Sequence, residues 1–306
     1  MKYSKLFIIF TLLLCLIIGG IYVIKYVSSS PKTVNNGITK VSKGELSSSE
    51  DYVNRGSIYF LKGQYDKAIS DFSRAMEINP QYALAYANRG AAYYRIGQYD
   101  EAISDLNKAI EINPGYAKAY FNRGVAYGKG KRQYDRAISD FTKAIRINSD
   151  YAEAYADRGN AYSDIAQYDQ AIPDYDKAIE INPMLAEAFN NRGIAYGKGK
   201  GQHDRAILDF SKAIEIDQMY AEAYANRGVA YGMTSQYEKA IADYNKAIEI
   251  NPRNAEAYFN KALVCEKLGR VQEAVEAYKG FIQYALPQYA PYIEHARQRI
   301  EGLEGK

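Results

Sequence analysis

The sequence contains no tryptophan and only two cysteines and two histidines among its 306 residues. Cys15 and Cys265 lie far apart, so we expect a fold that does not depend on a disulfide. His203 and His295 also stand alone, and no cluster of Cys, His or Asp has the spacing of a metal site. No serine or cysteine has an evident base partner. These absences predict a protein that is not an enzyme and that holds no metal and no cofactor.

Neither sign of charge dominates: 39 Lys and Arg stand against 36 Asp and Glu, for a net charge of +3. A dedicated polyanion binder needs clustered Lys and Arg, so no nucleic-acid partner is expected. Two basic segments, residues 127–133 and 196–202, each carry one extra residue and are predicted to be slightly longer solvated turns. The alternative is that these turns touch anionic lipid, nucleic acid or an acidic partner.

One long apolar run, residues 6–24, carries no charged side chain. A helix needs roughly 20 apolar residues to cross a bilayer core, whereas a cleaved signal peptide has an apolar stretch of about 7–15. We therefore predict a single-pass membrane anchor, or uncleaved signal, over residues 1–27. A cleaved signal peptide, which gives a secreted protein, and a buried soluble helix are the alternatives.

Basic residues flank this run on both sides. Lys2 and Lys5 precede it, together with the α-amino group, and Lys25 and Lys32 follow it. The positive-inside bias favours a cytoplasmic N-terminus by a small margin, which places the bulk of the chain outside the cytoplasm at the cell membrane. Residues 28–48 are rich in Ser, Lys, Asn and Gly and are predicted to be a flexible linker.

The rest of the chain repeats one pattern. A glycine recurs every 34 or 35 residues, and in most units a tyrosine lies three residues after it. The glycines are Gly56, Gly90, Gly124, Gly159, Gly193 and Gly228, with Ala262 in the seventh place. A single helical hairpin cannot bury its apolar side, so stacked units must share one continuous core. The period therefore predicts a repeat protein of seven units.

The markers of the second unit identify the type of repeat. They are Tyr86, Gly90, Tyr93, Ala102, Leu106, Ala109 and Pro114. This pattern resembles the tetratricopeptide repeat. It departs from the family in having Tyr where the family often has Trp, and Arg before the glycine where the family usually has Leu.

The resemblance implies an all-α fold, a right-handed superhelical α-solenoid of helix-turn-helix repeats. The predicted repeats span residues 49–82, 83–116, 117–151, 152–185, 186–220, 221–254 and 255–288. A C-terminal capping helix and tail are predicted at 290–306, because an open stack leaves an apolar face at its end.

Small residues predict where the two helices of a hairpin meet. Gly90 and Ala102 lack bulk at the place of close approach, and Leu106 fills the space beside them. Gly97 suits the short turn between the helices, and Pro114 cannot continue the second helix.

A row of polar residues, with a carboxamide in six of the seven units, lies two residues before each marker glycine or its replacement, Ala262. Its members are Asn54, Asn88, Asn122, Asp157, Asn191, Asn226 and Asn260, called here the asparagine row. In the family this place faces the inside of the superhelix, and the row is similar to the asparagine ladder of O-linked N-acetylglucosamine transferases, which grips peptide main chain. A carboxamide can both donate to and accept from a backbone amide. The alternative is a polar surface position copied by duplication.

Apolar side chains are expected beside the row. We predict that Phe121, Val125, Ile194, Val229 and Phe259 flank the peptide-binding groove. These side chains suit an extended segment with small apolar residues.

Charged pairs accompany the asparagine row. The next residue is Arg in six units and Lys261 in the seventh, and the second helices carry Asp in the same six units and Ala277 in the seventh. This joint loss predicts an Arg–Asp bridge, within a hairpin or between adjacent hairpins. The alternative is a solvated charge stripe of little energetic value.

These expectations combine into one function. The sequence predicts a non-catalytic interaction scaffold at a membrane surface, which docks an extended peptide or partner protein of unknown identity in its concave groove. The alternative is a structural or assembly subunit of a membrane-associated complex.

Overall fold

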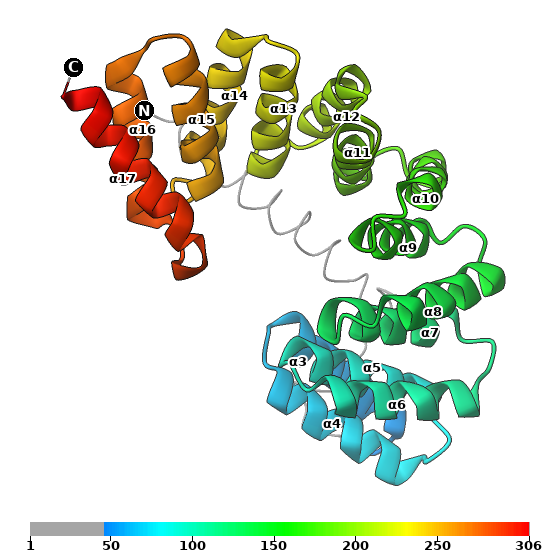
Figure 1. Cartoon of the computed structure of the whole chain (residues 1–306). Helices are drawn as coiled ribbons and strands as arrows, with labels where there is room; N and C mark the ends of the chain where they lie inside the picture. Colours follow the sequence, from blue (N-terminus) through cyan, green and yellow to red (C-terminus); the bar gives the residue numbers. More distant parts are fainter. Residues whose placement is uncertain (1–45, 306) are drawn as a thin grey trace, which may run out of the picture. The chain divides into compact units, whose positions relative to one another are not determined.

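The computed structural model describes residues 46–305, and within this range the chain is entirely helical, without a strand (Figure 1). The chain divides into two compact units, and the division falls within α9 (Ala152–Asp164). Each unit is described by itself. None of the helices between residues 46 and 305 is long and apolar enough to span a membrane. The predicted anchor, residues 1–27, and most of the predicted linker lie outside the described residues.

The first unit stacks three antiparallel helix pairs ahead of α9. Its helices are α3 (Ser49–Leu61), α4 (Tyr65–Ile78), α5 (Ala83–Arg95), α6 (Tyr99–Ile112), α7 (Ala117–Val125), η1 (Ala126–Gly130) and α8 (Tyr134–Ile147). Helices α3, α5 and α7 pack in sequence, each against its own partner, α4, α6 or α8 (Figure 1). These pairs are repeats 1 to 3.

The second unit continues the same arrangement. Its helices are α10 (Tyr168–Ile181), α11 (Ala186–Ile194), η2 (Ala195–Gly199), α12 (His203–Ile216), α13 (Ala221–Met233), α14 (Tyr237–Ile250), α15 (Ala255–Lys267), α16 (Val271–Tyr284), η3 (Pro287–Tyr289) and α17 (Ala290–Glu304). Helices α9 and α10 form repeat 4, and the pairs that begin with α11, α13 and α15 are repeats 5 to 7. Helix α17 packs on α16.

The marker glycines permit the close packing of each pair, as predicted. A Cβ atom at Gly90 would lie 2.9 Å from Cγ of Leu106 and 3.0 Å from the carbonyl oxygen of Ala102. Ala102 and Leu106 are completely buried. The turn between the helices holds one residue with positive φ, which is Gly97 at +80° in repeat 2 and Ala166 at +59° in repeat 4.

The extra residues of repeats 3 and 5 do not lie where the sequence suggested. They are absorbed in π-helical segments, η1 and η2, that close the first helices of these repeats. An inserted residue widens the helix locally to an i→i+5 pattern instead of lengthening the turn. The turns are not merely solvated, because Lys131 and Lys200 form ion pairs with Asp100 and Asp169 of the preceding repeats.

Helix α17 covers the last repeat. Ala296 is completely buried, and Ile293, Ile300 and Leu303 pack beside it against a core that includes Phe281. A bidentate bond from Arg299 to the Glu266 carboxylate, with Nη2 2.6 Å from Oε2, ties α17 to α15.

Candidate functional site

Six arginines fix the orientation of the first helices that carry the asparagine row. In each, Nε and Nη2 donate to the two oxygens of one aspartate in the second helix of the same repeat, at 2.6–2.9 Å. The pairs are Arg55–Asp71, Arg89–Asp105, Arg123–Asp140, Arg158–Asp174, Arg192–Asp209 and Arg227–Asp243. The aspartates are buried, so the predicted bridge is confirmed and the solvated stripe is wrong.

The same arginines also join neighbouring repeats. Nη1 of Arg89 donates to Oγ of Ser73 at 2.8 Å, and Nη1 of Arg192 donates to Asp176 at 2.6 Å. Arg123 and Arg227 make equivalent bonds to the preceding repeats. The bridge therefore acts both within a hairpin and between hairpins, and in repeats 1 to 6 it fixes the position of the row residue that precedes the arginine.

Burial and hydrogen bonding shift the pKa values of these pairs. The hydrogen bond to Asp105 is the main cause that raises the pKa of Arg89. Burial raises the pKa of the Asp174 carboxyl, although Arg158 opposes this shift. The guanidinium groups therefore stay charged at all physiological pH values.

In the first unit the asparagine row is buried. Asn54, Asn88 and Asn122 are 6%, 2% and 6% exposed. Nδ2 of Asn88 has no hydrogen-bond partner among the described residues. Asp157, the one acid of the row, pairs with Lys129 at 2.8 Å. A buried amide donor without a partner loses its hydration without compensation, so Nδ2 of Asn88 is an energetically costly group inside the first unit.

The predicted flanking residues of the first unit are core residues. Phe121 and Val125 are 4% and 2% exposed. The Phe121 ring packs against Phe141 and Tyr151, with ring centroids 5.7 and 4.9 Å away. These two side chains stabilise repeat 3 and do not line an open surface.

In the second unit the carboxamides form a hydrogen-bonded chain across three first helices. Nδ2 of Asn226 donates to Oδ1 of Asn190 at 3.0 Å, and Nδ2 of Asn190 donates to Oδ1 of Asn191 at 3.0 Å. Nδ2 of Asn191 then donates to Oδ1 of Asn160 at 2.9 Å, which also accepts from the Tyr175 hydroxyl. The row residues Asn191 and Asn226 are thus joined through Asn190, and the chain continues from Asn191 to Asn160; neither Asn190 nor Asn160 belongs to the row.

The sequence reasoning missed Asn160 and Asn190. Both replace a residue that is apolar in most other repeats: Asn160 stands in the place of Val125, and Asn190 in the place of Phe121. The presence of two carboxamides at mostly apolar positions of adjacent repeats was the feature of the sequence that could have indicated their role.

In the second unit, two of the recesses beside the row combine a row residue with predicted flanking residues. The first, called the α11–α13 recess, has a volume of about 360 Å³. Its lining residues include Ile194, Val229, Met233 and Phe210, with Lys198, His203 and Asn226 as the polar side chains. It thus brings together one row residue and two of the predicted flanking residues.

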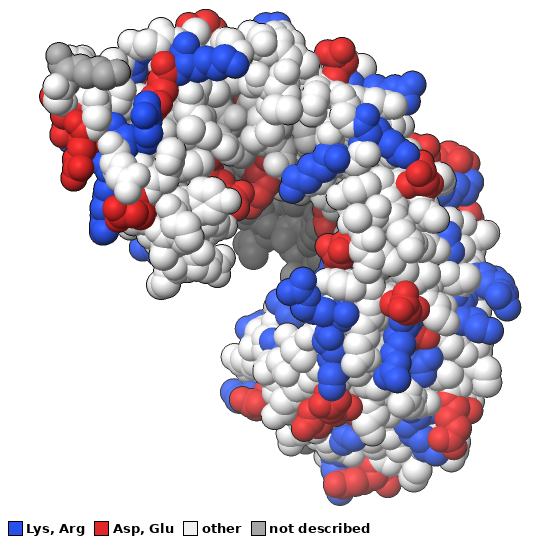
Figure 2. Space-filling view, in the orientation of Figure 1, with Lys and Arg blue, Asp and Glu red and all other residues white. Residues whose placement is uncertain are grey.

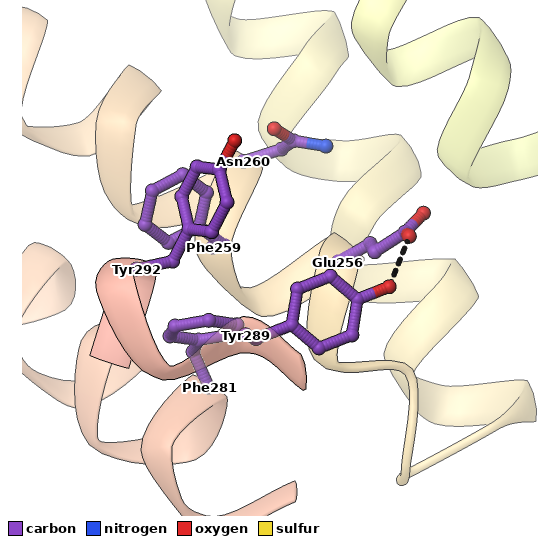
Figure 3. A pocket seen from close by; sticks show the side chains of 6 residues that line it. All are labelled: Glu256, Phe259, Asn260, Phe281, Tyr289 and Tyr292. Carbon is purple, nitrogen blue, oxygen red and sulfur yellow. Dashed lines mark hydrogen bonds between the residues drawn. The ribbon is translucent and has the colours of Figure 1, made fainter. Parts of the chain in front are cut away.

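The second recess, called the α15–α17 recess, has a volume of about 260 Å³ and is shown in Figure 3. The rings of Phe259, Phe281, Tyr289 and Tyr292 surround it, and Asn260 and Glu256 complete its lining. The Tyr289 hydroxyl donates to Glu256 at 2.8 Å. The row residue Asn260 and the flanking residue Phe259 therefore share one recess, and α17 supplies part of its wall.

On the face shown in Figure 2, charge does not single out another surface. Acidic and basic side chains are interspersed over the described helices of this face. Within residues 46–305, no group of three or more His, Cys, Asp or Glu side chains is arranged to hold a metal ion.

Repeat models match most of the described chain. A model described as TPR repeat matches residues 56–97, 92–130 and 200–235, and models described as tetratricopeptide repeat match 117–151, 152–185, 221–254 and 243–276. Together they cover more than half of the sequence. The chain belongs to the tetratricopeptide repeat family, whose members are generally protein-interaction scaffolds.

Several solved structures are similar to this chain. YrrB, described as a TPR protein with an unusual peptide-binding site, is 29% identical and has a TM-score of 0.50, over 61% of this chain and 95% of YrrB. A tetratricopeptide repeat protein from Parabacteroides merdae is 20% identical, with a TM-score of 0.61 over 84% of this chain and 98% of that protein.

PilF of Pseudomonas aeruginosa is 18% identical, with a TM-score of 0.61 over 70% of this chain and 97% of the PilF chain. The similarities to PilF and to the Parabacteroides merdae protein concern the fold alone. No match was found among curated proteins.

Proposed function

We propose that this chain is a membrane-tethered scaffold that docks an extended polypeptide segment along its first helices. The row residues that line the recesses, Asn226 and Asn260, bind the peptide main chain, and the recesses receive its apolar side chains. The observation that carries this proposal is the pairing of row and recess: Asn226 lies with Ile194 and Val229, and Asn260 lies with Phe259.

The chemistry of the row supports main-chain binding. A carboxamide offers two donors and an acceptor, so it matches a backbone amide of any sequence. Asn226 uses one of its N–H groups on Asn190, and Asn226 and Asn260 each line a recess in the second unit. The similarity to YrrB, a TPR protein with an unusual peptide-binding site, favours the same type of ligand.

The tether rests on the sequence of residues 6–24, which is long and apolar enough for one span. In this proposal the N-terminus is cytoplasmic and the repeats lie outside the cytoplasmic membrane. Protease added to intact spheroplasts is expected to leave a membrane-bound fragment and to remove the repeats. Repeats that are cut only after lysis place them in the cytoplasm, and repeats recovered entirely in the medium indicate a cleaved signal.

Site-specific photo-crosslinking in intact cells tests the docking role. A photoreactive residue at Val229, which is 41% exposed in the α11–α13 recess, is expected to crosslink to a polypeptide. The control is Leu208 on α12, which is 70% exposed and lies outside both recesses. Equal crosslinking at both positions to one stoichiometric partner would favour an assembly subunit over a docking scaffold.

A further inference from the structure

Two lysines in equivalent places of repeats 3 and 5 have different surroundings. Both stand in the sequence Ala-Tyr-Gly-Lys-Gly-Lys that forms a π-helical segment, as Lys129 in η1 and Lys198 in η2. Lys129 forms an ion pair with Asp157, its Nζ 2.8 Å from Oδ1. Asp157 is the row residue of the next repeat. The first unit therefore shows what this lysine position binds: the carboxylate of a side chain at the asparagine row.

The partner is missing in repeats 5 and 6. The row residue that follows Lys198 is Asn226, a neutral carboxamide in the place of Asp157. Lys198 is exposed and forms no ion pair within residues 46–305. Lys200, two residues further on, does have an acidic partner in Asp169. Within the described residues, Lys198 therefore lacks an acidic partner, whereas Lys200 in the same basic segment has one.

Lys198 and Asn226 both line the α11–α13 recess, whose walls are otherwise mainly apolar. Ile194, Val229 and Met233 provide most of this apolar wall, and Met233 is 64% exposed. A ligand that fills the recess must therefore bring an apolar side chain, and it gains more if it also brings a negative charge to Lys198. The second donor for that charge is the amide of Asn226.

We infer that the α11–α13 recess selects peptide segments in which an apolar residue is followed at the second position by Glu or Asp. The side-chain carboxylate binds Lys198 and Asn226, in the way that Asp157 binds Lys129. In an extended chain, residues i and i+2 point to the same side, so one segment presents both groups to the recess. This inference rests on the proposed docking of an extended polypeptide.

The test uses the full-length protein in detergent micelles and two pools of fluorescent peptides. The pools share a Leu-x-Glu or a Leu-x-Gln core and are otherwise randomised among the same small residues. We expect the Glu pool to bind about three- to fivefold more tightly at low salt, which corresponds to one exposed ion pair. The difference should shrink as salt screens the charges.

Variants assign the preference to one lysine. Lys198→Gln should bind both pools equally, whereas the matched control Lys200→Gln should keep the preference. Asn226→Asp should also remove the preference, because it places a carboxylate next to Lys198 as Asp157 does next to Lys129.

The outcomes separate this inference from the proposed function. If the wild-type protein binds both pools measurably and equally, or if Lys198→Gln keeps the preference, the inference is overturned and docking of extended peptides stands. If the wild-type protein binds neither pool, both the inference and the proposed function are overturned.

Discussion

Arg192 donates two hydrogen bonds to the Asp209 carboxylate, from Nε at 2.9 Å and from Nη2 at 2.6 Å. Its third nitrogen donates to Asp176 of the preceding repeat, so one guanidinium fastens three helices. Asp209 is 6% exposed. A charged hydrogen bond with two parallel contacts is both strong and directional, and a buried member left without its partner is costly.

We predict that Asp209→Ala lowers the free energy of unfolding by about 3–5 kcal/mol, because it leaves the Arg192 guanidinium without its buried partner. Urea denaturation followed by circular dichroism measures the loss. The control is Lys261→Ala in repeat 7, where the sequence has already lost the aspartate and carries Ala277. That change should cost no more than about 0.5 kcal/mol. Similar losses for both variants would mean that the bridge does not stabilise the stack.

A second prediction concerns the marker glycines. A Cβ at Gly193 would lie 2.8 Å from Cε1 of Phe210, so Gly193→Ala should destabilise the protein by about 1–3 kcal/mol through overpacking. Gly232, on α13, is the matched control, because its Cβ would meet only Val264, at 3.9 Å. Gly232→Ala should be neutral or stabilising by up to about 1 kcal/mol, since alanine favours the helix. Thermal unfolding compares the two, and a neutral Gly193→Ala would contradict close packing at the markers.

The repeating positions could be predicted because each is set by a contact that recurs in every unit. Gly90 against Leu106 and Arg89 against Asp105 have the same spacing throughout, so a change in one repeat shows in the others. The π-helical segments were missed because an extra residue has the same sequence whether it widens the helix or lengthens the turn. Lys198 has no acidic partner because the row residue of the next repeat is Asn226 instead of an aspartate. Only the structure shows that these two positions are neighbours.

The two recesses also could not be predicted from the sequence. Asn226 and Val229 could be placed on one helix face from their spacing, but their grouping with Met233 and Lys198 depends on how α11, η2 and α13 pack. Val125 and Val229 occupy the same place in their repeats, one residue after the marker glycine, yet the first is buried and the second is 41% exposed. Local packing decides between core and ligand surface, and the repeat pattern does not encode that decision.

A third prediction concerns pH. The hydrogen bond from Arg299 is the main cause that lowers the pKa of Glu266 below its usual 4.5. A carboxyl with a lowered folded-state pKa stabilises above its unfolded pKa, and that contribution is lost as the pH falls through the folded value. Helix α17 should therefore dock less firmly in acid than at neutral pH.

Hydrogen-exchange protection of the α17 amides measures this docking. Glu266→Gln should lower the protection at pH 7 and leave it nearly the same as wild type well below pH 4. A difference between the two proteins that does not change with pH would show that Glu266 does not anchor α17 through its charge.

A fourth prediction concerns the α15–α17 recess. Tyr292 is 53% exposed and its ring packs edge-on against Phe259, with centroids 5.6 Å apart. Tyr292→Ala should weaken the binding of a peptide pool with large apolar residues about fivefold, because part of the recess wall is lost. The melting temperature should fall by only a few degrees. Unchanged affinity would remove this recess from the ligand surface.

The central claim is that the asparagine row binds peptide main chain, and a double-mutant cycle on the backbone tests it most directly. The protein variant is Asn226→Ala with Asn260→Ala, and the control is Asn245→Ala, exposed on α14. The ligand change replaces main-chain amides of one peptide by esters, which removes N–H donors and weakens carbonyl acceptors.

Titration of both peptides against each protein gives the coupling energy. We predict that the esters weaken binding to the wild-type protein and to the Asn245→Ala control by about tenfold, and that they change binding to the double variant little. Equal weakening in all three proteins, at unchanged helicity, would contradict main-chain recognition by the row.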